Sequence, residues 1–109
     1  MGERRPTNDL VAPAHLYVEV SNVLRRSVLA GRLAREVAAL AHQDLVHAPV
    51  TTFPFALVAD RVWELHPSVT FYDAAFVALA EDLDLPLWTL DRELAASSGP
   101  RCSFRLPER

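Results

Sequence analysis

The chain has 109 residues, of which 50% are hydrophobic and 23% are charged. A chain of this size forms one compact core, and its composition excludes a disordered or fibrous protein. The net charge of -3 excludes a broad basic surface, so any contact with nucleic acid must be local.

The cysteine and histidine residues exclude two kinds of site. Cys102 is the only cysteine, which excludes an internal disulfide and a cysteine zinc site and fits a reducing cytoplasm. The histidines lack the spacing of a zinc-binding motif. Residues 1–8 precede no apolar signal segment, and no window reaches about 20 uninterrupted apolar residues. We therefore expect a cytoplasmic protein without a membrane segment.

The first half of the chain predicts a strand, two helices and a second strand. Residues 10–13 are a short apolar run that ends at a proline, which is typical of a strand entering a loop. Apolar residues recur at helical spacing over 15–30, where Gly31 ends the pattern, and again over 33–46. The β-branched residues between two prolines in 48–54 predict a short edge strand.

The second half continues the alternation. Helical spacing returns over 55–65, and the segment 70–84 is apolar almost all round, which predicts a buried helix. The near-continuous apolar run 85–90 predicts a parallel strand covered on both faces. A short helix over 92–96 and a last strand over 102–106 follow. Strands that alternate with helices predict an α/β layered fold with a parallel sheet.

Two aspartates, Asp73 and Asp91, occupy positions that either helix capping or ligand binding explains. Asp73 follows Thr70 at the spacing of a capping box, yet it also lies over an apolar stripe. An ionised carboxylate there needs a partner, which is the helix's own amides, an arginine or a metal ion. Asp91 lies between a predicted strand and a helix, so it is an N-cap or a ligand-binding residue at the carboxyl end of the strand.

The other acidic residues have simpler explanations. Glu19 flanks the apolar arc of the first helix, where a solvated position explains it, and the run Glu81, Asp82 and Asp84 predicts a solvated helix end. No single carboxylate is diagnostic. Their combination is more specific, because one lies on an early helix, one at the start of a buried helix and one after the following strand.

Three segments of the chain resemble the VapC-type toxins of the PIN-domain family. Residues 12–26 resemble the second strand and following helix, and residues 72–81 (YDAAFVALAE) are similar to the family's most recognisable run. Residues 87–95 (LWTLDRELA) look like its strand, Thr-x-Asp turn and short helix. The resemblance implies a three-layer PIN-like domain over 10–109, with a short parallel sheet flanked by helices, after a tail of residues 1–9.

The resemblance also implies an activity. PIN domains hold one or two Mg²⁺ or Mn²⁺ ions with four acidic residues, and oxygen ligands suit such hard ions. Carried onto this chain, Glu19, Asp73 and Asp91 would bind or orient the metal, and the hydroxyl of Thr89 would orient a carboxylate or a water unless it only packs. The implied protein is the toxin of a type II toxin–antitoxin system. Such a toxin is a metal-dependent endoribonuclease that cleaves RNA, binds a VapB-type antitoxin and forms a homodimer.

The start of the chain departs from the family pattern. The family's first strand, which is central in the sheet and ends in its first aspartate, would be expected before Leu10. Residues 1–9 are too short for that strand and its helix, which need roughly 20 residues. Asp9 is not a substitute, because it precedes the second strand. We therefore expect the first strand and one of the four carboxylates to be missing, and metal affinity to fall.

This departure leaves three alternatives. The first is an active ribonuclease whose true start lies upstream. The second is a catalytically inactive PIN-like module that binds an antitoxin or another protomer, and the third is a non-functional remnant. For the 109-residue chain we expect little Mg²⁺-dependent RNA cleavage. The loops contain no recognisable motif for reading bases, so the sequence does not identify an RNA target.

Overall fold

The computed structural model describes residues 10–108, which fall into two compact units. Unit 1 extends to Thr52, and unit 2 begins at Phe53. The predicted tail of residues 1–9 lies outside the described residues. Within 10–108, none of the helices combines the length and the apolar character needed to cross a membrane.

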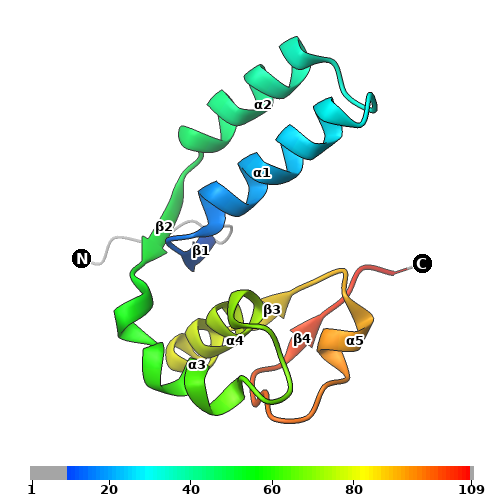
Figure 1. Cartoon of the computed structure of the whole chain (residues 1–109). Coiled ribbons are helices and arrows are strands. Elements are labelled where there is room, and N and C mark those ends of the chain that lie inside the picture. Colours follow the sequence, from blue (N-terminus) through cyan, green and yellow to red (C-terminus); the bar gives the residue numbers. More distant parts are fainter. Residues whose placement is uncertain (1–9, 109) are drawn as a thin grey trace. The chain divides into compact units, whose positions relative to one another are not determined.

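Unit 1 is a helical hairpin with a pair of strands at its base. Its elements are β1 (Leu10–Pro13), α1 (Leu16–Leu29), α2 (Arg35–Val46) and β2 (Val50–Phe53), whose last residue is the first of unit 2. The helices α1 and α2 pack side by side, and β1 pairs with β2 (Figure 1). Gly31 adopts a φ of 75° just after α1, a conformation that favours glycine, so the predicted end of the first helix is confirmed.

Unit 2 contains the main core of the described chain. Its elements are η1 (Phe55–Leu57), α3 (Ala59–Leu65), α4 (Phe71–Leu83), β3 (Leu87–Trp88), α5 (Arg92–Ala95) and β4 (Phe104–Arg105). The helix α4 packs against α3 and β3, and six of its residues are buried, which confirms the predicted buried helix. The core cluster consists of Val58, Val62, Leu65, Ala74, Ala75, Val77, Ala78, Leu79 and Leu94.

The strand pair of unit 2 is parallel, as predicted. Leu87 lies opposite Phe104, and Trp88 lies opposite Arg105. The α/β class, with helices beside short parallel strands, is therefore confirmed.

The strand predicted over 85–90 is shorter and more exposed than expected. It spans only Leu87–Trp88, and the prediction that both faces are covered is wrong, because Trp88 is 69% exposed and Leu90 is 84% exposed. Two local structures shorten the strand. At one end, the N–H of Leu85 donates to the Ala80 carbonyl and closes the end of α4. At the other end, the chain turns at Thr89.

Candidate functional site

Asp73 lies in the first turn of α4, where Thr70 is the N-cap. The backbone of Thr70 is extended, and its hydroxyl accepts a hydrogen bond from the Asp73 N–H at 3.2 Å. This bond satisfies one of the free amide groups at the start of the helix, which confirms the predicted capping interaction. Asp73 is half-buried beside the fully buried Ala74.

The carboxyl group of Asp73 lies in an environment that disfavours its negative charge. Burial removes water from the carboxylate and raises its pKa, and the charge of Asp91 raises this pKa further, while a hydrogen bond with the Thr70 side chain acts in the opposite direction. The pKa of Asp73 is raised as a result. Unit 2 therefore brings Asp73 and Asp91 close enough for their charges to repel each other.

Asp91 is held by two short-range interactions at the start of α5. Its Oδ1 atom accepts hydrogen bonds from the N–H groups of Glu93 at 2.9 Å and Leu94 at 3.1 Å, which confirms its N-cap role. Within residues 10–108, no hydrogen bond reaches its Oδ2 atom. The hydroxyl of Thr89 accepts a hydrogen bond from the Asp91 N–H at 3.0 Å. Thr89 thus holds the backbone of Asp91, and the carboxylate keeps one oxygen available for a ligand.

The donors at this position fit a hard divalent cation. Two carboxylates that repel each other are stabilised by a cation between them, and Mg²⁺ commonly binds one or two carboxylates while it keeps several waters. No group of three or more acidic, histidine or cysteine side chains that could hold a metal forms within the part of the chain that the structure describes. Asp73 and Asp91 are the candidate ligands in unit 2, and their role in metal binding stays a prediction.

Glu19 lies in unit 1, on α1. Its side chain is 42% exposed, and its Oε1 atom lies 4.0 Å from Nε2 of His15, one turn earlier. The predicted part of Glu19 in the acidic site stays a prediction.

Glu81 corrects the expectation of a solvated acidic run at the end of α4. Its side chain is only 14% exposed and accepts hydrogen bonds from Nε of Arg61 at 2.7 Å and from the N–H of Arg101 at 2.6 Å. Asp82 and Asp84 are exposed, as predicted. The sequence did carry a signal, because Glu81 follows the buried Val77 by four residues and so shares its face of the helix.

The environment of Glu81 favours its charge. Burial acts to raise its pKa, but the hydrogen bonds from the Arg61 side chain and the Arg101 backbone outweigh this effect, and the pKa lies below its ordinary value. Both oxygens of the carboxylate are engaged, because Arg61 also donates to Oε2 at 3.1 Å through Nη2. Glu81 is consequently a structural ion-pair residue.

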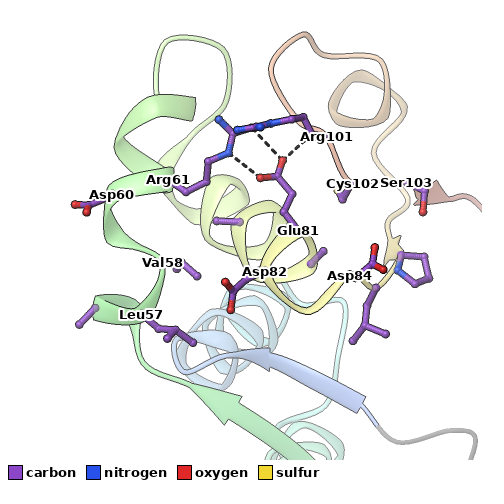
Figure 2. A pocket seen from close by; sticks show the side chains of 15 residues that line it. Leu57, Val58, Asp60, Arg61, Glu81, Asp82, Asp84, Arg101, Cys102 and Ser103 are labelled. Atoms are coloured by element: carbon purple, nitrogen blue, oxygen red, sulfur yellow. Dashed lines mark hydrogen bonds and ion pairs between the residues drawn. The ribbon is translucent and has the colours of Figure 1, made fainter.

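A cavity of about 720 Å³ lies at this same end of α4, and the Arg61–Glu81–Arg101 network forms part of its wall (Figure 2). Glu81 follows Asp73 by eight positions on the helix, a rise of about 12 Å. The cavity is lined by neither Asp73 nor Asp91. We therefore assign the candidate site to the two aspartates and not to the cavity.

Comparison with known proteins identifies relatives over most of the chain. The PIN domain family matches residues 3–99. Ribonuclease VapC1 of Mycobacterium tuberculosis is 41% identical over 96 residues, which cover 87% of this chain and 72% of the relative. Ribonuclease VapC12 of the same organism is 34% identical over 95 residues, which cover 87% of this chain and 74% of the relative. The chain belongs to the PIN-domain family, as one of its VapC-type members.

Proposed function

We propose that this protein is the toxin component of a type II toxin–antitoxin system and acts as a Mg²⁺- or Mn²⁺-dependent endoribonuclease. The observation that carries the proposal is the pair Asp73 and Asp91, whose charges repel each other and which form no ion pair with an arginine or histidine within residues 10–108. The similarity to proteins named ribonuclease VapC1 and VapC12 supports RNA as the substrate.

The residues of the site have separate tasks in this proposal. Asp73 and Asp91 would hold the cation, and the family resemblance implies Glu19 as a further acidic ligand. When bound there, such a cation would supply Lewis-acid chemistry, namely activation of a water and compensation of charge on the phosphate. The hydroxyls of Thr70 and Thr89 fix the backbones of the two aspartates, so that each carboxylate keeps its position when substrate binds.

The partners follow from the relationship to VapC proteins. We propose a VapB-type antitoxin, a homodimer and a cytoplasmic location. The alternative is a catalytically inactive PIN-like module that binds an antitoxin or another protomer. These two functions differ in one measurable property, the metal-dependent cleavage of RNA.

The test is cleavage of single-stranded RNA by the purified chain in Mg²⁺ or Mn²⁺. Asp73→Asn and Asp91→Asn should each lower the cleavage rate by about 100-fold or more, because metal-ion catalysis contributes several kcal/mol. Asparagine keeps the shape of each side chain and its ability to cap a helix. The matched control is Asp82→Asn, which removes an exposed carboxylate from the same helix and should retain the rate of the wild type.

Two results would contradict the proposal. Cleavage that persists unchanged in Asp73→Asn and Asp91→Asn would show that these residues are not the catalytic carboxylates. A wild-type chain that shows no cleavage in either metal would favour the inactive binding module.

A further inference from the structure

The ion pair between Glu81 and Arg61 anchors a segment distant from both residues in sequence. Nη2 of Arg61 donates to the carbonyl of Gly99 at 2.9 Å, and the N–H of Arg101 donates to Oε2 of Glu81 at 2.6 Å. Figure 2 shows Glu81 between Arg61 and Arg101. The pair thus fixes the backbone of 99–101 at two points. Arg61 donates to the carbonyl of Gly99, and Glu81 accepts from the N–H of Arg101.

Gly99 adopts a conformation that lets the segment 99–101 pass close to Ser68. Its φ is 106°, and a Cβ atom at this position would lie 3.0 Å from Oγ of Ser68. A glycine is therefore required where the segment passes the loop that follows α3. This packing brings the Gly99 carbonyl within reach of Arg61.

The anchored segment leads directly into β4, which in turn holds β3. The N–H of Leu87 donates to the Ser103 carbonyl at 2.9 Å, and the N–H of Thr89 donates to the Arg105 carbonyl at 3.1 Å. Thr89 then accepts the hydrogen bond from the Asp91 N–H. Hydrogen bonds and the short backbone segments between them therefore connect Glu81 with the turn that carries the Asp91 carboxylate.

The elements along this path are too short to hold their positions unaided. The strands β3 and β4 span two residues each, and α5 spans four. Strand pairs and helices of such lengths are not stable without tertiary contacts. Leu94 lies in the core, Leu87 and Phe104 pack against it, and the anchored segment 99–101 adds a polar fixed point directly before β4.

We propose that Glu81 and Arg61 are positioning residues for the Asp91 carboxylate. Their ion pair fixes residues 99–101, and these hold β4, β3 and the turn from Thr89 to Asp91 in place. The consequence for metal binding rests on the proposed function, whereas the ordering of the turn is independent of it. The two consequences can therefore be measured separately.

The first test is amide hydrogen exchange, measured by NMR on the metal-free chain. Glu81→Gln keeps the side-chain shape but removes the charge, and we expect exchange of the Thr89, Glu93 and Leu94 amides to accelerate about 10-fold or more. The amide of Leu79, in the middle of α4, should accelerate less than these three amides, because it reports only the loss of global stability. The matched control is Glu64→Gln, because Glu64 binds the same arginine at 3.2 Å with a side chain that is 63% exposed.

The pattern of exchange decides between positioning and general stability. A larger acceleration at the turn and α5 than at Leu79 supports the proposal. Unchanged exchange at the turn, or an equal loss of protection at Leu79, overturns it. If Glu81→Gln does not fold, the variant Arg61→Lys decides the question, because lysine retains the charge but lacks the two-pronged geometry of arginine.

The second test is the affinity for Mn²⁺, measured by water proton relaxation. Glu81→Gln should weaken Mn²⁺ binding about 10-fold, as is typical when a residue that orients a metal ligand is lost. Glu64→Gln should bind like the wild type. Wild-type binding that is equally strong in Glu81→Gln overturns the positioning role. Absence of Mn²⁺ binding in the wild type contradicts the proposed function instead, and the exchange experiment still decides on positioning.

Discussion

The two ends of α4 present a carboxylate in opposite surroundings. At the first turn, the pKa of Asp73 is raised by burial and by the charge of Asp91. Eight residues later, Glu81 meets Arg61 and the Arg101 N–H, and its pKa is lowered although burial opposes the change. Among residues 10–108, Arg61 pairs with Glu81, whereas no basic side chain forms an ion pair with Asp73. This difference separates a structural carboxylate from one that is suited to an external cation.

The largest effect on stability is expected when Glu81, at the end of α4, loses the guanidinium group of Arg61. Arg61→Met leaves the Glu81 carboxylate half-buried without its charged partner, and hydrogen bonds to charged groups contribute about 2 kcal/mol. We expect the free energy of unfolding in urea to fall by about this amount. If the free energy of unfolding falls no more than in Glu64→Gln, the ion pair of Glu81 does not stabilise the protein, and this contrast with Asp73 is lost.

The dependence of stability on pH sharpens the same comparison. Because the pKa of Glu81 is lowered by folding, its contribution to stability is present above the ordinary carboxyl range and is lost as the pH falls through its folded value. The difference in unfolding free energy between wild type and Glu81→Gln should therefore shrink from neutral to acidic pH. A difference that is constant across this range would contradict the assigned role of the charge.

Asp73 should show the opposite sign and a smaller effect. Because its pKa is raised, the protonated form favours folding at acidic pH, and this contribution is lost as the pH rises through its folded value. Asp73→Asn should consequently raise the melting temperature of the metal-free protein by a few degrees at neutral pH. Asp82→Asn is the control. A lower melting temperature for Asp73→Asn at neutral pH would mean that the charge of Asp73 is already compensated.

The regular elements were largely predictable from the sequence, because hydrophobic spacing and capping residues act locally. Thr70 and Asp91 cap their helices as expected. The family resemblance and the position of Asp91 after a strand also indicated the acidic pair.

The pairing of Glu81 was not predicted, because its partner Arg61 lies 20 residues earlier and meets it only when α3 packs on α4. The length of β3 was missed for a similar reason. The closing bond of α4 and the turn at Thr89 both use backbone groups that a longer strand would need. Local patterns thus predicted the helix starts at which Asp73 and Asp91 lie, whereas the pairing of Glu81 and the length of β3 depend on tertiary contacts.

The most direct test of the central claim is the binding of Mn²⁺ to the wild type, Asp73→Asn and Asp91→Asn. The claim is that Asp73 and Asp91 form a cation site, because no basic side chain within 10–108 pairs with either carboxylate. We predict that the wild type and Asp82→Asn bind Mn²⁺ and that both site variants lose this binding. Equal binding by the wild type and the two site variants, or no binding by the wild type, would contradict the claim.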